Sequence, residues 1–271
     1  DETGRVVALT VDVPLNFALN QPLSTFALAA IELLDLESET FALDVLSVIE
    51  ATLDDPRQIL SAQEHKARGE AVAVMKVEGI EYDERMELLE DVTHPQPLAE
   101  LLEGAFEIYL RGHPWLSEYH VSPKSVVRDM WERAMTFGEF VAFYGLSRSE
   151  GLVLRYLSDA YRALRNGVPA FARTEAVEDL TSWLGELVHQ VDSSLLDEWE
   201  QLTNPADGPA AEVTVPGGNR PLTANVRAFT VLVRNAMFRR VALAARRRYD
   251  ELGELDASSG WDAAAWQEAL E

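Results

Sequence analysis

The chain has 271 residues, 47% of them hydrophobic, and a formal net charge of −23 at pH 7. It contains no cysteine, which excludes disulfides, thiol nucleophiles and cysteine-based metal sites and favours a reducing cytosol. No apolar run approaches the length of a membrane span and no signal peptide is visible, so we expect a cytoplasmic protein. The first residue is Asp1 rather than methionine, and we take the chain to be a piece of a longer protein.

One strand and a series of helices are expected in the N-terminal part. Residues 5–13 alternate weakly between apolar and polar and predict a strand, within a segment 1–14 that would connect to upstream domains. Apolar periodicity, capping residues and helix-ending residues predict the next helices over 22–35, 41–53, 56–78, 81–91 and 97–111.

Capping signals define further helices in the middle of the chain. A Ser-Pro pair predicts the start of a helix over 122–134. Thr136 and Glu139 form a reciprocal capping box that starts a helix over 137–144, and Gly145 ends it at a position that favours a left-handed residue.

The next helix, residues 147–166, carries the strongest functional signal. Ser147 and Glu150 predict its start by a second capping box. Apolar residues at helical spacing form one face, and a polar stripe lies within about a third of the circumference at 100° per residue. We call this stripe the arginine stripe; it consists of Arg148, Gly151, Arg155, Ser158, Arg162 and Arg165.

The C-terminal part is divided by a linker. A helix is expected from residue 174 towards 199, and a stretch rich in Pro, Gly and Ala over 203–221 predicts a linker, with a possible short strand at 212–215. Two helices follow, a long one from 223 or 225 to about 252 and a last one over 261–270. The sequence therefore predicts an all-α bundle over 15–202, followed after the linker by a basic helical appendage over 222–271.

Positive charge is concentrated in two segments of this acidic chain. Residues 122–173 hold eight basic and five acidic residues, a net +3, and residues 220–248 hold eight basic residues and no acid, a net +8. The acidic load lies in 1–121 and 174–219. This distribution fits either ordinary positive helices between solvated acidic faces or a positive surface framed by acidic outer faces.

Signatures of catalysis are absent from the sequence. It has no phosphate-binding Gly-rich loop, no nucleophile elbow and no HExxH, and no two of its five histidines lie at i, i+4 on one helix. Pairs of acids are frequent, but with 46 acidic residues such pairs occur by chance. We expect this chain to catalyse no reaction and to hold no metal or cofactor.

Several interpretations of the arginine stripe are open. The helix over 137–144, the turn at Gly145 and the following helix have the shape of a helix-turn-helix, which would read duplex DNA. A row of arginines along the whole helix instead suits contact with a single strand, through phosphates and stacked bases. Asp159 lies within reach of Arg155 and Arg162, so these arginines are equally suited to intrahelical salt bridges.

The sequence also resembles a known family around this helix. The run MWERAMTFGEFVAFYGLSRSEGLVLRYLSDAYRALR, residues 130–165, resembles the C-terminal helical domain of superkiller-type superfamily II RNA helicases, which are exosome-associated DExH-box enzymes. Trp131-Glu132 with Ala134 matches the family's Trp–acid…Ala pattern, and 150–155 matches its Glu-Gly-x-hydrophobic-hydrophobic-Arg segment. Residues 15–270, with stretches such as SVIEATLDDPRQIL, resemble the C-terminal region of actinobacterial DEAD/DEAH-box helicases.

This resemblance implies a role beside a motor. RecA-like motor domains, with ATP and magnesium, would lie upstream, and the bundle would close a channel around single-stranded RNA or DNA. The helix over 148–165 would be the ratchet helix, which holds the strand between power strokes through Arg155 and its neighbours. Tyr156 stands where the wider family often has a basic residue, and it would either stack on a base or pack in the core.

The basic appendage adds a second candidate surface. Arginines point to several faces of the expected long helix, and they would either dock against the acidic helix from 174 or bind nucleic acid; the candidates for binding are Arg239, Arg240, Arg246 and Arg247. Three hypotheses result. They are a strand-guiding domain of an ATP-dependent helicase, an acidic docking module that recruits a partner such as a nuclease, and a helix-turn-helix DNA binder.

Overall fold

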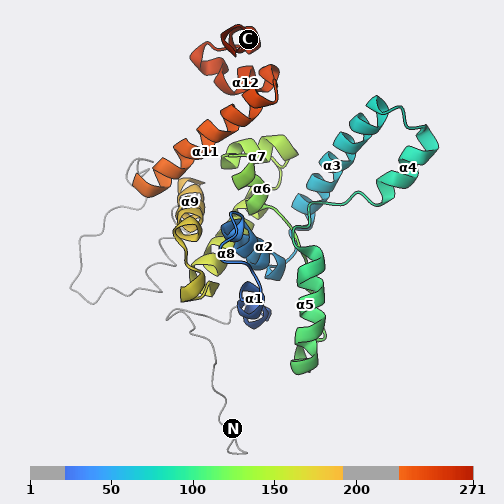
Figure 1. The fold of residues 1–271 in the computed structure, drawn as a ribbon, viewed down its shortest axis with the longest axis vertical. Coiled ribbons are helices and arrows are strands. Elements are labelled where there is room, and N and C mark those ends of the chain that lie inside the picture. Colours follow the sequence, from blue (N-terminus) through green and yellow to red (C-terminus); the bar gives the residue numbers. More distant parts are fainter. Residues whose placement is uncertain (1–21, 192–225, 271) are drawn as a thin grey trace, which may run out of the picture.

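The computed structural model describes residues 22–191 and 226–270. All regular structure in these two ranges is helical, which confirms the prediction of an all-α, multi-helix bundle (Figure 1). The expected strands at 5–13 and 212–215 and the linker at 203–221 lie outside the described residues.

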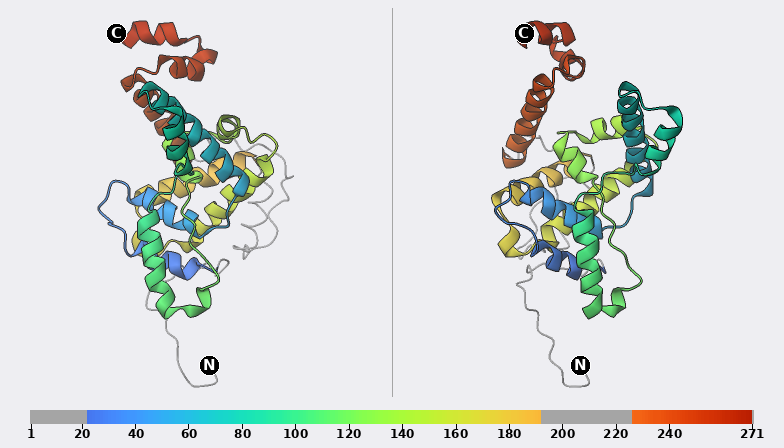
Figure 2. Two further views of the ribbon diagram at one scale, coloured as in Figure 1. Left: turned by 90° about the vertical axis from the view of Figure 1, so that its right-hand side faces the viewer. Right: turned by 45° about the vertical axis from the view of Figure 1, so that its right-hand side comes forward.

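The first five helices follow the predicted order with shorter bounds. They are α1 Ser24–Ile31, α2 Phe41–Thr52, α3 Arg57–Val77, α4 Tyr82–Glu90 and α5 Ala99–Gly112. Gly79 adopts φ +75° after α3, the left-handed conformation that ends a helix. Gln63 is the last buried residue of α3, and the rest of this helix forms with α4 a projecting two-helix arm (Figures 1 and 2).

The remaining helices complete the bundle and the appendage. They are a 3₁₀ turn Pro114–Leu116, α6 Val127–Glu132, α7 Phe137–Tyr144, α8 Glu150–Gly167, a 3₁₀ turn Ala170–Ala172, α9 Glu175–Val191, α11 Val226–Ala245, α12 Tyr249–Asp256, a 3₁₀ turn Ala257–Ser259 and α13 Ala263–Leu270. α11 packs on α9, and α12 packs on both α11 and α13.

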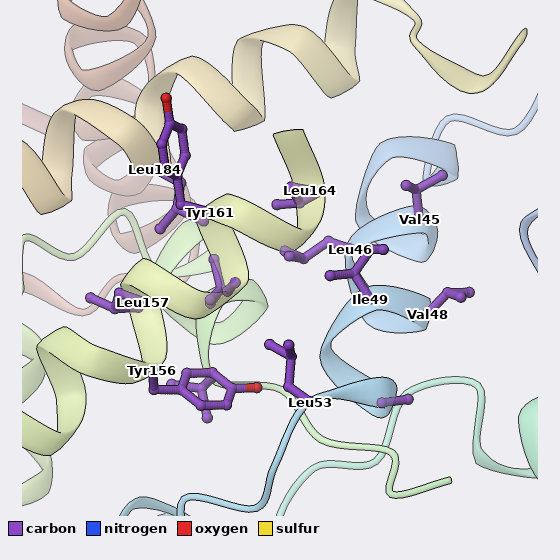
Figure 3. Close-up of a cluster of buried hydrophobic side chains, with 14 of the residues drawn as sticks. Val45, Leu46, Val48, Ile49, Leu53, Tyr156, Leu157, Tyr161, Leu164 and Leu184 are labelled. Atoms are coloured by element: carbon purple, nitrogen blue, oxygen red, sulfur yellow. The ribbon is translucent and has the colours of Figure 1, made fainter. Parts of the chain in front are cut away.

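The core lies where α2 and α8 cross. α2 packs against α1, α6, α8 and α9, and α8 packs against α9 as well. Leu46 and Ile49 of α2 meet Leu164 of α8 in this contact, and all three are buried (Figure 3). Burying one such side chain stabilises the fold by roughly 1.5–3 kcal/mol, so the apolar face of α8 fixes its position in the bundle.

A buried carboxylate organises the start of α6. Glu50 of α2 accepts hydrogen bonds from the backbone N–H groups of Val126, Val127 and Arg128 at 2.9, 2.9 and 3.1 Å, and from the Tyr156 hydroxyl at 3.0 Å. Burial raises the pKa of Glu50, while the donated hydrogen bonds act in the opposite direction. A side chain of α2 therefore supplies the N-terminal cap that α6 lacks in its own sequence.

The prediction of a helix over 122–134 is wrong at its start, because the preceding segment is held by tertiary contacts. The Lys124 ammonium is fully buried and donates to the carbonyls of Leu53 and Ser122 and to Oδ1 of Asp55. Burial lowers the pKa of Lys124, and the hydrogen bond to Asp55 opposes that change. These contacts hold the backbone before Val126 in a non-helical path, so α6 is only six residues long.

Two further boundaries differ from the prediction. α8 begins at Glu150 with Ser149 before it, and the Ser149 hydroxyl donates to Gln58 of α3 rather than capping the helix. The predicted capping box of Ser147 is therefore not formed. The long helix expected to reach 252 is broken into α11 and α12, because Arg247 adopts φ +56° between them.

Candidate functional site

The turn that leads into α8 is built from local signals. The side chain of Thr136 accepts from the Glu139 N–H and the Glu139 carboxylate accepts from the Thr136 N–H, as the predicted capping box requires. Gly145 ends α7 at φ +65°, and its N–H donates to Ala142 and Val141 carbonyls. This confirmed turn places the start of α8 on the surface beside the exposed Arg148.

The N-terminal half of the arginine stripe is exposed. Arg148, Gly151 and Arg155 all face solvent, and the Arg155 side chain is 80% exposed. A Cβ added to Gly151 would meet nothing within 4 Å, so the surface between the two arginines is open. This half can contact an extended anionic chain without any rearrangement of the bundle.

An acid divides the stripe at its centre. Asp159 Oδ2 lies 3.9 Å from Nε of Arg155, and its Oδ1 lies 3.6 Å from Nη1 of Arg162. Burial raises the pKa of Asp159, and the two arginines lower it. The intrahelical salt bridges that the sequence left open are thus present, though Arg155 keeps most of its side chain in solvent.

The C-terminal half of the stripe is partly covered. The Ser158 hydroxyl is buried and donates to the Leu154 carbonyl, so it is not available to a ligand. Arg165 donates to the Tyr161 hydroxyl at 3.0 Å. Arg165 also borders a pocket of about 240 Å³ between α8 and α9, with Arg173 on its rim.

The sequence did not single out Arg173 as a site residue. Its guanidinium donates to the carbonyls of Arg165 and Val168, so it satisfies backbone acceptors at the end of α8. The sequence offered one signal for this role, which is the position of Arg173 shortly after Pro169 at the end of the helix. Basic residues near a helix C-terminus often bind the last carbonyls.

Tyr156 belongs to the core rather than to the stripe. Its side chain is 5% exposed, and Figure 3 shows the hydroxyl pointing towards α2. Burial and the neighbouring Glu50 raise its pKa. Of the two alternatives for this residue, the structure therefore supports packing, and a base cannot stack on the ring in this arrangement.

The basic appendage is partly engaged within the chain. Arg239 Nη1 lies 3.6 Å from Glu139 of α7. Arg240 donates hydrogen bonds from both Nε and Nη2 to the carboxylate of Asp256 in α12. Arg234 lies 3.3 Å from Asp179, which agrees with docking of this helix on acidic α9. Arg246 and Arg247 are exposed at the end of α11.

No group of three or more His, Asp or Glu side chains that could hold a metal ion occurs within residues 22–191 and 226–270. In the part of the chain that the structure describes, no helix combines the length and apolar character needed to cross a membrane.

Neither the curated proteins nor the solved structures include a significant match to this chain. A family model described as "Domain of unknown function (DUF3516)" matches residues 1–271. The chain therefore belongs to the DUF3516 family.

Proposed function

We propose that this chain is an accessory domain of an ATP-dependent helicase that guides single-stranded RNA or DNA past upstream motor domains. The observation that carries the proposal is the exposed half of the arginine stripe, with Arg148 and Arg155 on either side of open Gly151. Guanidinium groups bind phosphates and stack on bases with little dependence on sequence. The family resemblance around 130–165 supports a motor partner, with ATP and magnesium in that partner.

The rigidity of α8 supports the same role. Its inner face is packed against α2 and α9, and Tyr156 is tied to Glu50. A helix that holds a strand between motor steps must keep its contact groups at fixed positions, because a mobile helix would move with the strand. The exposed arginines here are presented by a buried scaffold.

Fluorescence anisotropy with single-stranded and duplex oligonucleotides over a salt series tests the proposal. We expect salt-dependent binding to single strands, and weaker binding by Arg155→Ala by about 1 kcal/mol or fivefold. Arg111→Ala is the matched control, because Arg111 is an exposed arginine at the end of α5. Equal affinities of both variants and unchanged unwinding by the parent helicase would refute the proposal.

A second candidate function is a docking module without nucleic-acid contact. The ion pairs from Asp159 to Arg155 and Arg162 favour it, since they use the stripe inside the chain. This function would be supported if the domain bound no oligonucleotide but the parent helicase still recruited its partner through it. A preference for duplex DNA of defined sequence would instead indicate a helix-turn-helix reader.

A further inference from the structure

The arm formed by residues 64–90 has no core of its own. None of these residues is buried, although they make up most of α3, the turn and all of α4. α3 and α4 contact each other, and a hydrogen bond from Arg85 to the Ile80 carbonyl ties α4 to the turn between them. A two-helix hairpin without buried residues gains little from packing, so a surface that covers it would stabilise it.

Large apolar side chains are exposed along this arm. Val77 is 90% exposed, Tyr82 62%, Val74 56% and Met86 41%. The outer part of the arm, residues 78–90, holds six acids and one arginine, a net −5. The surface that covers the arm must therefore be apolar and bordered by positive charge.

α11 has that complementary character. Residues 226–248 hold seven arginines and no acid. Four of them pair with acids of the same chain, namely Arg234, Arg239, Arg240 and Arg248, whereas Arg246 and Arg247 are exposed at the end of the helix. Exposed apolar side chains recur along α11 at intervals of three or four and thus share one face; they are Val226, Phe229, Val233, Met237 and Val241. The helix is about 30 Å long, and the arm projects about 20 Å beyond Gln63, so their lengths are compatible.

The two features are separate within one molecule. Figure 1 and the right-hand view of Figure 2 show α3–α4 and α11 as distinct projections, with α7 between their bases. We propose that the arm of one molecule docks along the apolar face of α11 in a second copy of the same chain. A two-fold arrangement uses this contact twice and leaves neither surface open.

Charge sets the register of this contact. The acidic end of the arm lies next to the exposed Arg246 and Arg247 of the second copy. Each chain carries a net charge of −23, so the overall field opposes association and only local complementarity favours it. A substitution that makes the arm less negative therefore lowers the overall repulsion but removes the local attraction, so its effect on dimer formation tells the two apart.

Sedimentation velocity of the whole chain over a concentration series provides the test. Wild-type protein should form a dimer. The triple change Glu84→Lys, Glu87→Lys and Glu90→Lys should raise the dimer dissociation constant about tenfold or more, although it lowers the overall repulsion. The control Glu100→Lys, Glu103→Lys and Glu107→Lys on α5 changes the net charge equally and should not weaken the dimer.

A complementation experiment distinguishes the contact from misfolding. The pair Arg246→Glu and Arg247→Glu should also abolish the dimer, but an equal mixture of this variant with the arm variant should restore it. In the mixed dimer, lysines face glutamates at one contact and native charges meet at the other. A monomeric wild type at all concentrations, an equal loss in the α5 control, or a mixture that stays monomeric would each overturn the proposal.

Discussion

The Tyr156 hydroxyl donates a 3.0 Å hydrogen bond to Oε1 of Glu50, and so joins α8 to α2 across 106 positions of sequence. Both residues are buried. Because successive helical side chains are about 100° apart, a fixed Tyr156 directs its neighbour Arg155 outward. One buried pair thereby sets the rotation of α8 and the exposure of the arginine stripe.

Replacement of Tyr156 by Phe should lower the free energy of unfolding by about 1 kcal/mol, because Glu50 loses one buried donor while the ring packing remains. Urea denaturation measures this change. The affinity for single strands should not change, because the ring is inside the core. A large loss of strand affinity at unchanged stability would show that Tyr156 contacts the strand after all.

Replacement of Glu50 by Gln should destabilise the fold by about 1–3 kcal/mol. Oε2 of Glu50 accepts a hydrogen bond from the Arg128 N–H. An NH₂ group in its place would point a second donor at this N–H, and the hydrogen bond would be lost. Glu87→Gln is a suitable control, since Glu87 is exposed on α4, away from α6. The control should change stability by less than about 0.5 kcal/mol. Equal effects in urea denaturation would contradict a capping role for Glu50.

Two glycines that flank the start of α8 should respond in opposite directions. Gly145→Ala should destabilise by about 1 kcal/mol, because φ is +65° there. Gly151→Ala should stabilise by about 0.5–1 kcal/mol, because this residue lies within a helix with open space around it. Thermal denaturation measures both effects. If a strand lies on the stripe, Gly151→Ala should nevertheless weaken binding, because its methyl group stands between Arg148 and Arg155.

Neutralising Asp159 should strengthen strand binding. Asp159→Asn removes the negative charge between Arg155 and Arg162, so we expect about a threefold rise in single-strand affinity at low salt. Anisotropy titrations check this, with Glu103→Gln on exposed α5 as the matched charge control. If both variants raised the affinity equally, the effect would reflect net charge rather than contact at the stripe.

The junction of α11 and α12 should weaken in acid. Hydrogen bonds from Arg240 hold the pKa of Asp256 below its usual range. A carboxyl group with a lowered folded-state pKa stabilises the fold above its unfolded pKa of about 4, and this contribution is lost as pH falls through the lower value. Asp256→Asn should therefore cost about 1 kcal/mol near neutral pH. In denaturation curves over a pH series, the difference from wild type should disappear in acid; a constant difference would exclude this linkage.

Much of the α7–α8 region could be predicted from sequence, because its signals are local. The capping box of Thr136 and Glu139 and the left-handed turn at Gly145 depend on residues within one helical turn. The all-helical class likewise follows from periodicity and composition. The start of α6 could not be predicted in this way, because its cap is Glu50, 76 positions before Val126. The fully buried Lys124 depends on Leu53 and Asp55 for the same reason.

By itself, the sequence determined that four arginines lie on one side of a helix and that the chain is acidic overall. Helical periodicity fixes the angles between side chains, but it does not say which arc of the helix neighbouring elements will cover. Only the tertiary structure decided that Arg148 and Arg155 are exposed, whereas Ser158 and Tyr156 are buried. The physical reason is that packing on α2 and α9 selects the covered arc, and those contacts are made by residues distant in the sequence.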